Sequence, residues 1–113
     1  MTAARLEGRR VYISGPMEMY AGCGYNKDQF DLVEGLCSAA GAAEVVNPAR
    51  LVAEVESGAL TREQALERDL RDLLGCDAIV MLDGWQLSDG AMLEWMVAKD
   101  TGKEVLTEWS VRS

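Results

Sequence analysis

Glu94 is the acidic residue whose surroundings best suit chemistry. It follows Ser88 and Gly90 in the segment Ser-Asp-Gly-Ala-Met-Leu-Glu, which leaves an expected strand and opens an expected helix. Side chains of a helix lean toward its N-terminus, so Glu94 is expected to project over Gly90, where no side chain blocks a ligand. Ser88 at the helix start would leave backbone N–H groups free for an anion or a polar sugar group. The plain alternative is a capped surface helix with an ordinary glutamate.

Three further side chains are candidates for the same site. Asp69 lies at the flank of the apolar stripe of the preceding helix, where most charged residues are simply solvated. Tyr12 lies inside the first expected strand, where it could also be a packed aromatic residue. Trp85 follows Gly84 after the third strand, and it could either stack on a base or cover the core.

The absence of histidine and the number and spacing of the cysteines exclude several classes of catalytic and metal site. The sequence has no histidine, which excludes Ser-His and Cys-His pairs and leaves carboxylates, Tyr, Lys or Cys for proton transfer. The three cysteines (Cys23, Cys37 and Cys76) are odd in number and show no CxxC spacing, so neither a disulfide framework nor a zinc site is expected. We expect no metal and no cofactor.

Charge and length narrow the class further. Nineteen acidic against eleven basic residues give a net charge of −8, which would repel a nucleic-acid polymer but leaves small nucleosides and nucleotides possible. The 113 residues are expected to form a single domain, residues 1–113. The longest apolar run, residues 78–82, is far below the roughly 20 residues that span a bilayer. Since no apolar run follows the arginines near the N-terminus, we expect no signal peptide and a cytoplasmic location.

The positions of apolar residues and turn residues predict the elements that would hold these side chains. Strands are expected at residues 10–14, 44–47, 78–82 and 104–106, and helices at about 27–40, 61–74 and 88–101, with a short helix and a break at Gly58 within 49–60. Asn26 and Ser88 are expected caps, and Thr61 with Gln64 has the pattern of a capping box. Leu66, Leu70 and Leu73 are expected to face the core.

Alternating strands and helices predict an α/β fold of the doubly wound, Rossmann-like or flavodoxin-like type. Right-handed crossovers give a parallel sheet of about four strands in the order 2-1-3-4, with helices on both faces. Ligands bind such sheets at the carboxyl ends of the strands, beside the point where the strand order reverses. Here that point lies between the first and third strands, which end at Gly15-Pro16 and at Asp83-Gly84-Trp85.

Read together, the motifs resemble a known superfamily. They are Val11-Tyr12-Ile13-Ser14-Gly15-Pro16-Met17, Asn26-Lys27, Val46-Asn47-Pro48-Ala49, Arg68-Asp69-Leu70, Cys76-Asp77, Gly84-Trp85 and Ser88-x-Gly90-Ala91-x-x-Glu94. In this order and spacing they are similar to a small, often phage-borne branch of the nucleoside 2-deoxyribosyltransferase superfamily, over about residues 10–106. That superfamily includes transferases that exchange bases on deoxyribose and hydrolases that release the base from nucleoside 5′-monophosphates.

The resemblance implies roles for individual residues. Glu94 would be the nucleophile, Asp69 the proton donor and acceptor at the base, and Tyr12 the residue that orients the nucleophile. The substrate-binding residues would be Gly15, Pro16, Asn47, Asp83, Trp85, Ser88 and Gly90. The resemblance further implies a homo-oligomer, in a bacterial cell or in host cytoplasm if phage-encoded.

Phosphorylation of the substrate stays open. Ser88 matches a phosphate-binding serine of the hydrolases, whereas Pro16 and Glu18 stand where those enzymes use a serine and a cationic residue. Two classes compete with an enzyme of N-glycosidic bonds: a protein that sequesters a nucleotide without turnover, and a structural or assembly protein in which Glu94 and Asp69 are surface acids.

Overall fold

The sheet has the predicted strand order. A computed structural model describes residues 6–17 and 26–112. Within them, β1 (Arg10–Ser14), β2 (Glu44–Val46), β3 (Ala78–Met81) and β4 (Glu104–Thr107) form one sheet in the order β2-β1-β3-β4. All three pairings are parallel, with Tyr12 opposite Val46 on one side and Ile79 on the other. The reversal of strand order therefore lies at β1 and β3, as expected.

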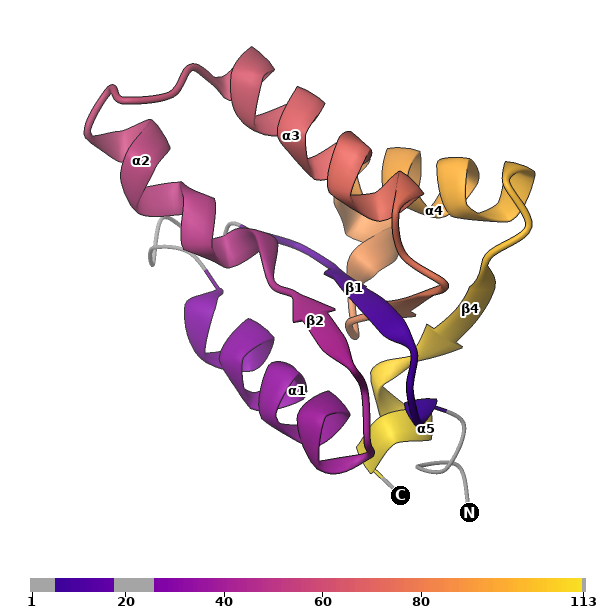
Figure 1. Ribbon diagram of the computed structural model, residues 1–113. Coiled ribbons are helices and arrows are strands. Elements are labelled where there is room, and N and C mark those ends of the chain that lie inside the picture. Colours follow the sequence, from indigo (N-terminus) through magenta and orange to yellow (C-terminus); the bar gives the residue numbers. More distant parts are fainter. Residues whose placement is uncertain (1–5, 18–25, 113) are drawn as a thin grey trace.

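Helices cover both faces of this sheet (Figure 1). The helical elements are α1 (Lys27–Ala39), η3 (Pro48–Leu51), α2 (Val52–Glu56), α3 (Arg62–Leu74), η4 (Trp85–Leu87), α4 (Asp89–Asp100) and α5 (Glu108–Arg112). One face packs against α1 and α5, and the other packs against α3 and α4. None of the helices in the described ranges is long and apolar enough to cross a membrane.

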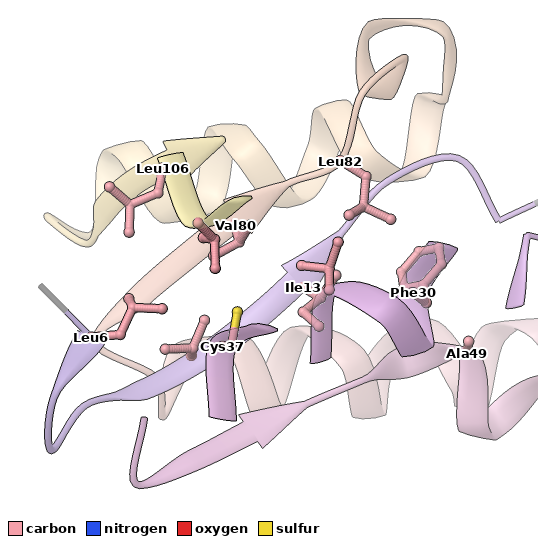
Figure 2. Packing of buried hydrophobic residues seen from close by; sticks show 11 residues of the cluster. Leu6, Ile13, Phe30, Cys37, Ala49, Val80, Leu82 and Leu106 are labelled. Carbon is pink, nitrogen blue, oxygen red and sulfur yellow. The ribbon is translucent and has the colours of Figure 1, made fainter. Parts of the chain in front are cut away.

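Alternation along β1 separates two cores. Val11 and Ile13 belong to the core under α1 and α5, with Phe30 and Cys37 of α1 and with Val80 of β3 (Figure 2). Tyr12 belongs to the second core, under α3 and α4, with Leu73, Ile79, Met81, Ala91 and Ala98. Since successive side chains of a strand point to opposite faces, Ser14 lies on the same face as Tyr12.

The helix starts mostly follow their sequence signals. The capping box of α3 is present, because the Thr61 side chain accepts from the Gln64 N–H and the Gln64 side chain accepts from the Thr61 N–H. The Ser88 side chain caps α4 by accepting from the Ala91 N–H at 3.2 Å. Asn26 stands at the N-cap of α1, but its side chain donates to Gln29 Oε1 and makes no capping hydrogen bond. The expectation of an Asn26 side-chain cap was therefore wrong.

Two other features differ from expectation. Leu66 is 39% exposed, whereas Leu70 is half-buried and Leu73 is fully buried, so the apolar stripe of α3 reaches the core only in its second half. The helix α5 follows β4 directly and was not predicted. Its five residues are too few to show a helical period, so no sequence pattern could indicate it.

Candidate functional site

A buried carboxylate lies at the centre of the α3–α4 face. The side chain of Glu94 comes from the second turn of α4, and the residue is only 8% exposed. Tyr12 Oη donates to Glu94 Oε2 at 2.8 Å, and Ser14 Oγ donates to Glu94 Oε1 at 2.5 Å. Both carboxylate oxygens are therefore held by hydroxyl groups of β1.

The contact between Tyr12 and Glu94 was expected, whereas the role of Ser14 was missed. Tyr12 and Ser14 are two residues apart on one strand, so their side chains point to the same face. This two-residue period was the available sequence signal, because a side chain that packs over Tyr12 on this face of the sheet can also contact Ser14.

Burial and hydrogen bonding have opposite effects on the pKa of Glu94. Burial raises the pKa of its carboxyl group above the usual value, while the hydrogen bonds from Ser14 and Tyr12 lower it. The pKa of Tyr12 is raised well above its usual value by burial and then by the negative charge of Glu94. Tyr12 therefore stays protonated and keeps its role as a donor to the carboxylate.

Asp69 of α3 is the second carboxylate on this face. Burial, followed by the negative charges of Glu94 and Asp72, raises the pKa of Asp69 to about 7, against an opposing effect of Arg68. Its Oδ1 atom is buried and accepts no hydrogen bond within the described residues. The negative charge of Glu94 is among the causes that raise the pKa of Asp69. The two carboxyl groups differ in their partners: Glu94 accepts hydrogen bonds from two hydroxyls, whereas Asp69 has a buried oxygen without a hydrogen bond among the described residues. Buried carboxyl groups with raised pKa values are typical of functional sites.

A hollow of about 250 Å³ opens beside Asp69. It lies between the β2–η3 segment (Val46, Asn47 and Pro48) and α3, which contributes Arg68, Asp69 and Asp72. Glu94 does not line it. The space therefore lies on the Asp69 side of the carboxylate pair, toward the edge strand β2.

The side chain of Asn47 is fully engaged by other residues. Its Oδ1 accepts from the Ala49 N–H at 3.0 Å, and its Nδ2 donates to Asp31 and Glu34 of α1 at 2.9 and 3.0 Å. Asn47 thus fixes the turn between β2 and η3, and it borders the hollow without offering a free polar atom.

The strand ends that were expected to bind substrate pack closely. A Cβ atom at Gly15 would lie 2.6 Å from Leu82 Cβ, so only glycine fits between the ends of β1 and β3. Gly84 has φ +85° and packs near Pro16, where an added Cβ would lie 3.8 Å from Pro16 Cγ. Glycine is therefore required at Gly15 by the close packing and favoured at Gly84 by the left-handed backbone.

The connection from β3 to α4 carries the remaining expected residues. Trp85 is half-buried and packs on Trp95, with ring centroids 5.3 Å apart, so its indole covers the core. The Asp83 side chain is exposed. At Gly90 an added Cβ would meet only Ser88 Oγ, at 4.0 Å, so the space above this glycine is open as expected.

Some expected features cannot be placed. Glu18 and Cys23 lie outside the described residues. Among the residues that are described, no group of three Cys, Asp or Glu side chains is arranged to hold a metal ion.

One buried charged residue has no counterpart in the sequence analysis. Glu108, the first residue of α5, is 1% exposed and accepts hydrogen bonds from the Asp83 N–H, Gln29 and Arg112. Burial opposes ionisation of Glu108, but these hydrogen bonds outweigh it and lower the pKa. No spacing or motif distinguishes this glutamate from the exposed ones, which is why it was missed.

Fold and site together define a class: a parallel α/β domain in which α3 and α4 supply two partly or fully buried carboxyl groups, Asp69 and Glu94, on one face of the sheet. The chain matches, over residues 9–107, the family described as a domain of unknown function, DUF4406, and it belongs to that family. No curated protein and no solved structure matches the chain.

Proposed function

We propose that the protein cleaves or exchanges the N-glycosidic bond of a nucleoside, a deoxynucleoside or a nucleoside 5′-monophosphate. One observation carries the proposal: Glu94 is buried with both carboxylate oxygens held by hydroxyls, while the neighbouring Asp69 has a pKa of about 7 and an unpaired buried oxygen. Retaining glycosidases use two carboxyl groups, an ionised nucleophile and a protonated acid, and we assign these roles to Glu94 and Asp69.

The reaction proceeds in two steps. Glu94 attacks the anomeric carbon, the carbon–nitrogen bond breaks, and its electron pair leaves with the base as Asp69 transfers its proton to the base nitrogen. Water or a second base then attacks the glycosyl ester as Asp69 takes back a proton, which frees Glu94 and retains the anomeric configuration. Tyr12 and Ser14 orient the carboxylate and favour its ionised form.

The surroundings suggest where each part of the substrate lies. The leaving base must reach Asp69, and the hollow beside Asp69 offers space for a planar ring. The sugar would lie above Gly90, where no side chain stands. A 5′-phosphate, if present, would lie at the start of α4 near Ser88, because N–H groups at a helix N-terminus attract anions.

We also propose a homo-oligomer in the cytoplasm. Met92, Leu93 and Met96 on α4 are 40%, 39% and 52% exposed, which supports a contact with a second copy through this helix. The measurement is the mass of the native protein in solution.

The decisive experiment combines product analysis with trapping of the intermediate. The protein is incubated with a panel of nucleosides and 5′-monophosphates, and free base is measured by chromatography. A 2-fluoro-2-deoxy nucleoside, which slows hydrolysis of the glycosyl ester, is then added and the intact mass is recorded. We expect released base and a glycosyl adduct that peptide mapping assigns to Glu94. An adduct on another residue would contradict the nucleophile, and absence of both base and adduct would contradict the enzyme.

A binding protein without turnover is the second candidate. It is favoured by the hydrogen bonds from Tyr12 and Ser14, which already occupy one lone pair on each oxygen of Glu94. Calorimetric binding of a nucleotide without release of base would support this alternative.

A further inference from the structure

The carboxylate of Glu108 is fully engaged although it lies in the core. Its Oε1 accepts from the Asp83 N–H at 2.7 Å and from Gln29 Nε2 at 2.6 Å, and its Oε2 accepts from Arg112 Nε at 2.7 Å. A buried carboxylate is costly unless hydrogen bonds and an opposite charge compensate it, and here all three donors do so.

These contacts reach described residues that follow both β1 and β3. Asp83 is the second residue of the connection from β3 to α4. Gln29 lies in the first turn of α1, where its Oε1 accepts from Asn26 Nδ2 at 2.5 Å. The backbone N–H of Asn26 in turn donates to Met17 O at 2.6 Å, just after β1. One carboxylate thus connects both sides of the site rim.

The connection held at Asp83 carries groups that face the candidate site. It runs through Gly84, which has a left-handed backbone, into η4 with Trp85, and then to Ser88, which caps α4. A shift of Asp83 would therefore move the start of α4, which we propose as the phosphate-binding end. Glu108 itself lies on the other face of the sheet, with α5, and contacts neither Glu94 nor Asp69 within the described residues.

We propose that Glu108 is a positioning residue, whose carboxylate fixes the start of the connection from β3 to α4 and thereby sets the geometry of substrate binding at the start of α4. The effect on substrate rests on the proposed function, whereas the effect on this connection does not. A positioning role predicts a change in KM without a change in the acid–base chemistry, because the pair Glu94 and Asp69 stays intact.

The first test needs no substrate. Amide hydrogen exchange is measured by NMR in Glu108→Ala, Glu108→Gln and wild type, with Glu56→Gln on α2 as the control that removes one exposed acid. In Glu108→Ala we expect the Asp83 amide to exchange about tenfold faster or more, because its acceptor at Glu108 Oε1 is gone, while β3 amides keep their rates. Glu108→Gln retains one acceptor oxygen and should rescue most of the protection. If Glu108→Ala does not fold, Glu108→Gln must still accelerate exchange at Asp83 more than at β3.

A further variant tests the contact of Glu108 with Gln29 independently of its contact with Asp83. Gln29→Ala breaks the path to Asn26 but leaves the bond from Asp83 to Glu108, so exchange should rise at Asn26 and stay unchanged at Asp83. Unchanged exchange at Asp83 in Glu108→Ala, or an equal rise across β3, would overturn the proposal.

The second test uses the substrate. With an accepted 5′-monophosphate, Glu108→Ala should raise KM severalfold while kcat and the pH profile stay near wild type, and Glu108→Gln, which keeps an acceptor for the Asp83 N–H, should raise KM less. A fall in kcat at unchanged KM would overturn the positioning role. If the wild-type protein releases no base, the proposed function fails, and the exchange experiment still decides the role of Glu108.

Discussion

Tyr12 Oη and Glu94 Oε2 lie 2.8 Å apart, although the two residues are separated by 82 positions in the chain. The hydrogen bond joins the middle of β1 to the second turn of α4, across the crossover that contains α3. Its length depends on the pairing of β1 with β3 and on the cap at Ser88. The state of the carboxylate is therefore tied to the central packing of the fold.

Tyr12→Phe tests this relationship directly. The variant removes one donor to the carboxylate, so the pKa of Glu94 should rise and the acidic limb of the pH–rate profile should move to higher pH. We expect kcat/KM to fall about tenfold or more at neutral pH, since a hydrogen bond to a charged group contributes about 1.5–3 kcal/mol. Ser14→Ala should act in the same direction. An unchanged acidic limb in both variants would show that these hydroxyls do not control Glu94.

Glu94→Gln tests the nucleophile at nearly constant size, and Glu94→Ala tests it by deletion. Both should lower kcat by about a thousandfold or more, while affinity changes little, because the lost bond forms only during the reaction. Turnover is measured as released base, and affinity is measured by calorimetry with the same substrate. Full kcat in Glu94→Ala would refute the assignment.

Asp69 should control the alkaline limb of the profile. Its proton is lost near pH 7, so kcat/KM should fall above that pH, and Asp69→Asn should remove the limb and hurt poor leaving groups most. Carbon-13 NMR of the carboxyl group measures the pKa directly. A measured pKa near 4 would show that Asp69 is ionised at neutral pH and would contradict its role as the general acid.

The same group makes stability depend on pH in a defined direction. The pKa of Asp69 is raised from 3.8 to about 7 on folding, so the stability from its neutral form is complete below pH 3.8 and is lost as pH rises through 7. Asp69→Asn should therefore gain about 1–2 kcal/mol over wild type at pH 8 relative to pH 4, after allowance for solvent screening. Urea unfolding at both pH values measures the difference. Asp100→Asn, which removes an exposed acid from α4, is the matched control.

Ser88→Ala separates phosphorylated from unphosphorylated substrates. Loss of the cap should lower the free energy of unfolding by about 1 kcal/mol, and loss of order at the helix start should weaken binding of 5′-monophosphates more than of nucleosides. Binding is compared by calorimetry for one nucleoside and its monophosphate. If Ser88→Ala weakens the binding of the nucleoside and of its monophosphate equally, the start of α4 does not bind the phosphate.

The fold could be predicted because several local signals agreed. Apolar runs bounded by glycine and proline marked the strands, and the capping patterns at Thr61 and Ser88 marked two helix starts. Their alternation then allowed few topologies. The contact of Tyr12 with Glu94 was expected from the family resemblance.

The rest depended on contacts between distant segments. The half-exposure of Leu66 depends on where α3 leaves the sheet, which its own periodicity does not encode. The engagement of Asn47 depends on acids of α1, and the burial of Glu108 depends on a helix too short to show a pattern. In each case a polar or apolar side chain has the same local sequence signal whether or not its distant partner exists.

The division of β1 between two cores has a consequence for natural variation. Val11 and Ile13 pack under α1 and α5, whereas Tyr12 and Ser14 face α3 and α4, so we expect adjacent positions of this strand to be constrained by different helices. Within the DUF4406 family, odd positions of the strand should covary with α1 and α5, and even positions with α3 and α4. A substitution at Tyr12 or Ser14 thus changes the candidate site directly, while the core that Val11 and Ile13 form on the opposite face keeps its side chains.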